Sequence, residues 1–566
     1  MNYKISLAEI LATHTGLPQA ELVQAIESPT DPKMGHMAFP CFRLAKELKK
    51  APPVIAAEVA EKITAAQPPW LEQAVATGPY VNFFFNRTTF AADVLAEIFG
   101  KGEQYGASGI GNGKNIAMDY SSPDIAKPMH VGHLGSTIIG HSLDKIHRFL
   151  GYNVTSINHL GDWGTQFGKM IVAYQKWGSK EDIENTGIDG LVALYVRFHE
   201  EADKDKSLDD EARAWVVKLQ NGDEEGLALW RWFIDISLKE YEKQYAQLGI
   251  SFDLYRGESY YNDKMDAVVE TLRQKSLLKE SDGAQIVDLE EYKMPPCLIL
   301  RSDGGTLYAT RDIATAIDRQ ECFKFDKCLY VTGLEQMLHF QQFFKVLELM
   351  GYPWASGLVH IPYGMFRFEH GKLSTRRGDV IKMEELIDEA VSKTREIIAE
   401  KNPNLADKDT VAEQVGIGAL IFNKLYTNRI KDTVFSWELM LNFDGETGPY
   451  VQYAHARACS VLEKGGYTPG GKFAPELLTE NEAFDVLRII YDFPAKIEDA
   501  AEKYEPFMIA RQLVALAQAF NSFYHHHIIL VEDEALKQAR LALVAAVQMQ
   551  LQIGLKLLGV SAPRAM

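Results

Sequence analysis

A strand, a helix and a second strand follow one another between residues 115 and 158, and this pattern limits the possible folds more than any other feature of the chain. NIAMDYS and NVTSINHL are short and apolar, and HVGHLGSTIIGHSLDKIHRFLGY between them has helical periodicity. Two strands joined by such a helix pair in parallel through a right-handed crossover. KCLYVTG and GLVHIPYG repeat the strand pattern further along. The sequence therefore predicts an α/β domain built on a parallel sheet.

Three predicted domains are arranged around this pattern. Residues 1–112 combine helical stripes with the aromatic, strand-like GPYVNFFF, which indicates an α+β domain. Residues 113–385 contain the sheet, and a charged helical stretch at about 178–245 indicates an insertion within it. Residues 386–566 are almost entirely helical in pattern. We therefore expect a multidomain α/β protein with an all-α C-terminal region.

Composition and charge exclude several classes of protein. Hydrophobic residues make up 46% and charged residues 24% of the 566 positions, which excludes a mainly disordered or collagen-like chain. The net charge of −18 argues against broad, nonspecific nucleic-acid binding but leaves room for local basic patches. The five cysteines form no CxxC pair, which argues against a zinc site and fits a reducing cytoplasm. The chain shows no signal-peptide pattern and no apolar run of about 18 residues, so we expect no membrane association.

The first candidate site follows the first predicted strand. DYSSPDIAKPMHVGH places polar residues at the end of that strand and His130, Gly132 and His133 at the start of the helix. Ligands of α/β proteins bind at the carboxyl ends of parallel strands, and helix N-termini favour phosphate. The two imidazoles can donate hydrogen bonds to phosphoryl oxygens, and Gly132 lets adenine or phosphate approach the backbone. Lys127 adds a cation. The alternative is a pair of ordinary core or surface histidines.

A second candidate is the basic segment FEHGKLSTRRGDVI. Lys372 and Arg376 surround the small residue Ser374, so this segment has the composition of a mobile, cationic loop. Such a loop can close over a triphosphate and stabilise departing pyrophosphate. Taken alone, it can equally be a solvated basic loop.

Both candidates belong to a longer resemblance. HVGH resembles the HIGH signature of class I aminoacyl-tRNA synthetases, and KLSTR resembles their KMSKS loop. With SSPDIAKPMHVGHL, NHLGDWGTQFG, LYATRDI, LEQMLHFQQ and FDGETGPYVQYAHAR, the chain resembles arginyl-tRNA synthetases nearly from end to end. The resemblance implies a Rossmann-like catalytic domain, an N-terminal domain that contacts the corner of the tRNA, and a C-terminal anticodon-binding bundle.

The resemblance also implies an activity. Such an enzyme activates L-arginine with ATP to arginyl-adenylate and pyrophosphate, then transfers arginine to the terminal adenosine of tRNA(Arg), initially at the 2′-hydroxyl. Mg²⁺ would accompany ATP as part of the substrate, and no structural metal is expected. A cytoplasmic monomer is the family expectation.

Residue by residue, the resemblance assigns roles at the active site. Catalysis would involve His130, His133, Lys127, Lys372 and Ser374, and ATP binding would add Gly132 and Arg376 to the same set. Lys127 resembles the lysine that compensates for the missing second lysine of KMSKS. For arginine, the implied residues are the carboxylates Asp119 and Asp312, Tyr308 beside them, and Ser122, Asp124 and Gln336 at the amino-acid backbone. An acid at a helix start that satisfies local N–H groups is the alternative for Asp312.

Contacts with tRNA are implied at both ends of the chain. Asn82 and Phe85 match positions expected at the tRNA corner, with buried strand residues as the alternative. Tyr450 and Tyr453 can stack on unpaired loop bases, with core packing as the alternative, and Met566 is expected near the anticodon loop.

Three positions depart from the family pattern. Gly135 stands where the family has Arg, His141 where it has Asp, and Asp124 where it has Asn. We interpret the first two as one salt bridge that was lost together. The departures leave open a tRNA-binding paralogue without aminoacylation activity. Another HIGH-containing nucleotidylyltransferase is a further alternative, but the long helical C-terminal third argues against it.

Overall fold

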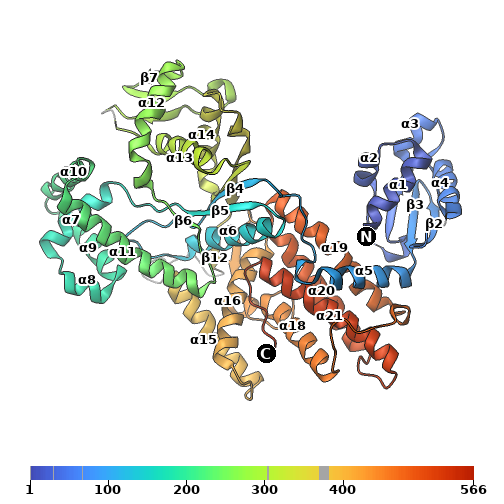
Figure 1. The fold of residues 1–566 in the computed structure, drawn as a ribbon. Coiled ribbons are helices and arrows are strands. Elements are labelled where there is room, and N and C mark those ends of the chain that lie inside the picture. The colour runs from blue at the N-terminus through green and yellow to red at the C-terminus, as the bar shows by residue number, and fades with distance from the viewer. Residues whose placement is uncertain (1, 30, 67, 303–304, 369–380) are drawn as a thin grey trace. The chain divides into compact units, whose positions relative to one another are not determined.

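The computed structural model describes residues 2–29, 31–66, 68–302, 305–368 and 381–566, and it divides into two compact units (Figure 1). One unit comprises residues 1–105, 454–493 and 515–553. The other comprises residues 106–453, 494–514 and 554–566 and contains the predicted sheet. Each unit is therefore assembled from segments that lie far apart in the sequence.

The sheet of the second unit is parallel throughout, which confirms the predicted fold class. Its strands are β4 (Asn115–Asp119), β5 (Asn153–Asn158), β6 (Leu254–Tyr255), β10 (Lys327–Gly333) and β11 (Leu358–Tyr363), in the order β11-β10-β4-β5-β6. The chain runs outward from β4 to one edge and later from β10 to the other. The strand order reverses between β4 and β10, and ligands of α/β sheets bind at the carboxyl ends of strands beside such a reversal.

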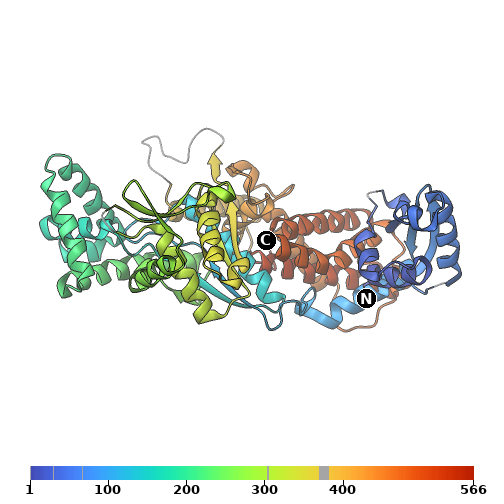
Figure 2. The ribbon, with the colours of Figure 1, turned by 90° about the horizontal axis from the view of Figure 1, so that it is seen from above.

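Helices complete this unit. They are α6 (Val131–Phe149), α7 (Thr165–Trp177), α8 (Lys180–Thr186), α9 (Ile188–Ala202), α10 (Ser207–Gln220), α11 (Glu224–Gln247), α12 (Met265–Gln274), α13 (Tyr308–Phe323), α14 (Met337–Leu349), α15 (Met383–Lys401), α16 (Lys408–Tyr426) and α17 (Trp437–Met440). Helix α6 connects β4 to β5 and is buried along most of its length. Helices α7 to α11 gather into a cluster of their own at one end of the unit (Figures 1 and 2).

Two small sheets were not predicted from the sequence. The antiparallel strands β7 (Leu278–Ser281), β8 (Ala284–Val287) and β9 (Cys297–Leu300) form one. Its first turn has positive φ at both Asp282 and Gly283, and Asp-Gly is the preferred pair for such a hairpin. In the other, β12 (Phe366–Phe368) pairs in parallel with β13 (Thr433–Phe435). Strand β13 therefore interrupts the region that was predicted to be almost entirely helical.

The first unit contains the N-terminal α+β fold and a helical region. Strands β1 (Met37–Pro40), β3 (Tyr80–Phe85) and β2 (Leu71–Thr77) pair antiparallel in that order beside α1 (Tyr3–Thr15), α2 (Gln19–Ala25), α3 (Ala45–Leu48), α4 (Pro52–Ala66) and α5 (Arg87–Lys101). Segments of α18 (Gly448–Lys464), α19 (Asn481–Lys503), α20 (Phe507–His526) and α21 (Glu534–Leu557) form its helical part. The predicted helical character of the C-terminal region is confirmed, and β13 is the exception to it among the described residues.

Residues 554–566 cover the back of α6 within the second unit. The Ser142 hydroxyl donates to the Leu557 carbonyl at 3.0 Å. Gly559 has a φ of +76°, a backbone conformation that favours glycine, and a Cβ atom there would lie 2.9 Å from the His141 ring. Both the backbone conformation and the close contact therefore require glycine at this position. Further along, the Ser561 carbonyl accepts a hydrogen bond from Gln452 at 2.9 Å. This segment is therefore part of the packing of helix α6.

His141 makes the stability of this unit dependent on pH. Both ring nitrogens are buried without a hydrogen-bond partner, and burial lowers the pKa of His141 to about 3. The folded protein holds the ring neutral while the unfolded chain takes up a proton below about pH 6.5, so stability falls as the pH drops. At pH 4.5 this contribution amounts to about 2–3 kcal/mol.

In the variant His141→Leu, the free energy of unfolding should fall less between pH 7.5 and pH 4.5 than in the parent. The difference should be about 2–3 kcal/mol, and urea unfolding at the two pH values measures it. His525→Leu, at an exposed histidine, is the matched control. An equal reduction in both variants would contradict the assignment to His141.

Among the helices of the described residues, none is long and apolar enough to cross a membrane.

Candidate active site

A cavity of about 540 Å³ opens at the carboxyl ends of β4 and β10, at the point where the strand order reverses. Many of the predicted site residues line it together: Asp119, Ser122, Asp124, His130, Gly132, His133, Tyr308, Asp312 and Gln336. These residues come from the loop before α6, from the first turns of α6 and α13, and from η6 (Leu334–Gln336). The fold therefore brings together residues that lie up to about 200 positions apart in the sequence.

The loop from β4 to α6 has a strained backbone. Ser121, Ser122 and Ala126 all have positive φ, between 50° and 74°, which costs a non-glycine residue roughly 1–3 kcal/mol. Contacts hold this conformation in place: the Ser121 amide donates to the Ser136 hydroxyl at 3.0 Å, and the Ser121 hydroxyl lies 2.6 Å from the Tyr245 hydroxyl. Backbone strain that is maintained in this way is typical of functional loops.

The two histidines of HVGH cap the helix that they begin. The His130 ring accepts a hydrogen bond at Nδ1 from the Gly132 amide, and the His133 ring accepts one at Nδ1 from the His130 amide, both at 3.1 Å. The ring centroids lie 3.9 Å apart. Because each Nδ1 accepts a hydrogen bond, a neutral ring carries its proton on Nε2. The caps therefore leave two Nε2–H donors for a ligand.

Both rings are neutral near pH 7. Burial lowers the pKa of His130, and burial together with the neighbouring His130 lowers the pKa of His133 to about 4. Neutral imidazoles donate hydrogen bonds without bringing in a full positive charge. This part of the cavity therefore suits an anion that gains charge during a reaction.

Asp119 lies at the end of β4 and already contacts a guanidinium of the chain itself. Arg319 of α13 donates to its Oδ2 at 2.6 Å, and the Ser122 hydroxyl donates to its Oδ1 at 2.8 Å. The pair is buried, and Arg319 lowers the pKa of Asp119 although burial opposes this. The carboxylate predicted to read the substrate guanidinium is therefore largely neutralised by an internal arginine.

Asp124, one of the departures from the family pattern, pairs with Lys127. The Lys127 ammonium donates to Oδ2 of Asp124 at 2.8 Å, and this interaction raises the pKa of Lys127. Both side chains are about half exposed. The acid at this position is therefore balanced by the cation three residues later, and Lys127 lies directly beside the cavity.

Asp312 lies on the first turns of α13 and contacts an imidazole. Its Oδ2 is 2.5 Å from Nε2 of His339, which lies on the first turn of α14. Tyr308, at the start of α13, is 73% exposed at the rim of the cavity.

The sequence did not single out several residues that line the same cavity. Glu258 forms an ion pair with Arg311 at 2.7 Å, and burial raises the pKa of Glu258 to about 7. His159 and His339 also line the cavity. His159 and His339 fall within quoted segments, NHLGDWGTQFG and LEQMLHFQQ, so the signal for them was present.

The interpretation of Gly135 and His141 as one lost salt bridge is wrong. A Cβ atom at Gly135 would lie 2.9 Å from the Tyr363 ring and 3.6 Å from the Lys424 side chain, whereas His141 contacts Gly559. The two positions are six residues apart on α6 and face different elements. A restored Arg–Asp pair could not form there.

The residues predicted to contact tRNA lie in both units. Asn82 and Phe85 on β3 are buried, with 3% and 2% of their surface exposed. This burial agrees with the alternative given above, that they are buried strand residues. Tyr450 and Tyr453 lie on α18, and Tyr453 is 38% exposed. The Met566 carbonyl accepts a hydrogen bond from Asn402 at 3.0 Å, and its side chain packs against α15 and α16. The tRNA contacts stay predictions.

Lys372, Ser374 and Arg376 lie outside the described residues. In the part of the chain that the structure describes, no group of three or more His, Cys, Asp or Glu residues could hold a metal ion.

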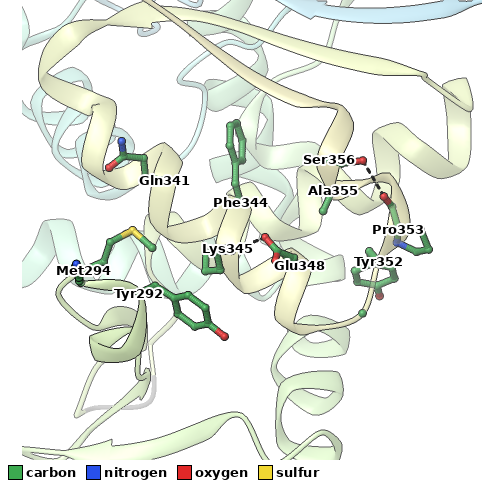
Figure 3. A pocket seen from close by; sticks show the side chains of 12 residues that line it. Tyr292, Met294, Gln341, Phe344, Lys345, Glu348, Tyr352, Pro353, Ala355 and Ser356 are labelled. Atoms are coloured by element: carbon green, nitrogen blue, oxygen red, sulfur yellow. Dashed lines mark hydrogen bonds and ion pairs between the residues drawn. The ribbon is translucent and has the colours of Figure 1, made fainter. Parts of the chain in front are cut away.

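A second hollow, of about 880 Å³, lies on another face of α14 (Figure 3). Tyr292, Phe344 and Tyr352 contribute aromatic surface to it, and Lys345 forms an ion pair with Glu348 at 2.6 Å. Helix α14 therefore presents His339 to the first cavity and Phe344 to the second.

Family models match almost the whole chain. Residues 94–437 match the model of the class I tRNA synthetase (R) catalytic domain, and residues 451–566 match the DALR anticodon binding domain. Residues 2–85 match the arginyl tRNA synthetase N-terminal domain.

Individual proteins agree with these models. The chain is 54% identical to the arginine–tRNA ligase of Alkaliphilus metalliredigens and 50% identical to that of Clostridioides difficile, each over the full length of both chains. The solved Thermus thermophilus arginyl-tRNA synthetase superposes with a TM-score of 0.84 at 25% identity, over 100% of this chain and 99% of that one. The Plasmodium falciparum enzyme, at 24% identity and a TM-score of 0.78, shares the fold over 96% of this chain and 94% of its own. The chain belongs to the arginyl-tRNA synthetase family.

Proposed function

We propose that this chain activates L-arginine with ATP and transfers the arginine to tRNA(Arg). The observation that carries the proposal is the cavity in which two neutral histidine donors at a helix start face a group of carboxylates. That combination suits a substrate with a phosphoryl group at one end and a cation at the other. The family assignment supports the same reaction.

In the activation step, a carboxylate oxygen of arginine attacks the α-phosphorus of ATP, and the bond to the bridging oxygen breaks as pyrophosphate leaves. His130 and His133 donate from Nε2 to phosphoryl oxygens as their charge increases. Gly132 faces the adenine, and Lys127 adds a cation beside the phosphates. Lys372, Ser374 and Arg376 are the remaining residues that we propose for ATP binding. Mg²⁺ accompanies ATP as part of the substrate.

Arginine lies at the acidic side of the cavity. Asp312 pairs with the guanidinium, and Tyr308 covers it from the rim. Ser122, Asp124 and Gln336 position the amino and carboxylate groups. Asp119 contributes by holding Ser122 and Arg319 in place, and its remaining negative potential favours a cation.

In the transfer step, the 2′-hydroxyl of the terminal adenosine attacks the adenylate carbonyl, loses its proton, and AMP leaves. Residues 1–112 and 386–566 bind the tRNA, and residues 113–385 form the catalytic domain. Asn82, Phe85, Tyr450, Tyr453 and Met566 are the proposed contact residues. The enzyme acts as a monomer in the cytoplasm.

The test is ATP–pyrophosphate exchange with arginine in the presence of tRNA(Arg). We expect exchange with L-arginine and at least 100-fold less with L-citrulline, because citrulline has the same shape but no charge to pair with the carboxylates. Exchange without tRNA decides nothing, because this family generally needs tRNA for activation. If no exchange occurs when arginine and tRNA(Arg) are both present, the result would favour the alternative of a tRNA-binding paralogue without aminoacylation activity.

A further inference from the structure

Five acids line the cavity, and apart from the exposed Glu335 they differ in their partners. Asp119, Asp124 and Glu258 each pair with a side chain that is charged at neutral pH: Arg319, Lys127 and Arg311 respectively. Asp312 instead contacts an imidazole, His339. The imidazole donates a hydrogen bond to one carboxylate oxygen. Among these four acids, Asp312 is therefore the one whose contact is an imidazole and not a guanidinium or ammonium group.

The contact with His339 fixes the orientation of the Asp312 carboxylate. His339 donates to Oδ2 of Asp312 at 2.5 Å, which restricts rotation of the carboxylate and leaves Oδ1 for another donor. A planar guanidinium is read by oxygens in a fixed arrangement, so a carboxylate that turns freely binds it less well.

His339 is itself held by an aromatic group that is anchored to the sheet. Its ring packs on Phe343 at 5.4 Å and on Phe340 at 5.7 Å between centroids. Phe340 stacks on His360 of β11 at 4.4 Å with an interplanar angle of 8°. His360 in turn hydrogen-bonds the Thr332 hydroxyl of β10 at 2.8 Å. The position of Asp312 is thus linked to strands β10 and β11 of the sheet.

We propose that His339 is a positioning residue for the amino-acid substrate: it orients the Asp312 carboxylate toward the guanidinium. The inference rests on the proposed function and deepens its account of arginine specificity. His339 acts through Asp312 and does not touch the reacting atoms, so its removal should affect arginine binding and spare ATP binding.

The experiment compares His339→Leu with His339→Gln by steady-state aminoacylation. Leucine keeps the packing on the phenylalanines but removes the donor, and we expect the KM for arginine to rise about 10- to 100-fold, with kcat and the KM for ATP changed less than about threefold. Glutamine places an N–H donor near the position of Nε2 and should restore most of the loss. Gln341→Leu, on the face of α14 that lines the second hollow, is the matched control and should behave as the parent (Figure 3).

Equal impairment of the leucine and glutamine variants would overturn the inference, and so would an unchanged KM for arginine in His339→Leu. A parallel rise in the KM for ATP would point to a purely structural role and would also overturn it. Thermal unfolding of each variant shows whether that variant folds, so a failure to fold is distinguished from these results. The glutamine variant keeps the donor and the polar character of the position. A parent enzyme that charges no arginine would instead refute the proposed function.

Discussion

Asp312→Ala is expected to lower kcat/KM for arginine by about 30- to 5,000-fold while the protein remains folded. Removing one partner of a close charge pair costs about 2–5 kcal/mol, and each 1.36 kcal/mol is a factor of ten. The effect should appear mainly as a raised KM for arginine, because the guanidinium lies away from the reacting carboxylate. Steady-state aminoacylation with arginine and ATP varied in turn measures both quantities.

Glu321→Ala is the matched control for this prediction. Glu321 is an exposed acid on the same helix, α13, and its loss changes the net charge equally. It should leave both KM values unchanged. A normal KM for arginine in Asp312→Ala would refute the guanidinium assignment.

Arg319→Leu is expected to destabilise the catalytic unit by about 3–5 kcal/mol. Arg319 is completely buried and donates to Asp119 at 2.6 Å, so its removal leaves a carboxylate buried without a counter-ion. The pKa of Asp119 should then rise, because burial acts on it without the opposing guanidinium. Urea unfolding followed by tryptophan fluorescence measures the loss.

The double variant Arg319→Leu with Asp119→Asn tests the mechanism. Removing the charge together with its partner should recover more than half of the lost stability, since replacing both members of a buried ion pair is often close to neutral. Asparagine can still accept the Ser122 hydrogen bond. A double variant as unstable as Arg319→Leu would show that the loss arises from packing and not from an unpaired charge.

Much of the fold could be predicted because local patterns determine it. KCLYVTG corresponds residue for residue to β10, and the Pro52-Pro53 start corresponds to the beginning of α4. The β7–β8 hairpin was missed although Asp282-Gly283 is a strong turn signal, because its strands are short and largely polar on the exposed side. Strand β13 has three residues and pairs with a strand more than 60 positions away, which periodicity does not report.

The candidate site was predictable where its residues share one motif. The Asp124–Lys127 pair spans three positions and follows from the motif itself. The Asp119–Arg319 pair spans 200 positions, and nothing in either segment indicates that an internal arginine reaches the same carboxylate. The coupling of Gly135 and His141 failed for the related reason that spacing along a helix does not reveal what each face packs against.

The packing of residues 554–566 against α6 has a consequence for the synthesis of the chain. The Ser142–Leu557 hydrogen bond joins residues 415 positions apart. At about 5–20 residues per second, the ribosome needs roughly 20–80 s to make the covering segment after the helix has been made. For that interval the helix that begins with HVGH exists without its full packing. Fragments released early would therefore carry the signature sequence without the full packing of α6, and nascent chains depend on protection from aggregation until residue 557 has been added.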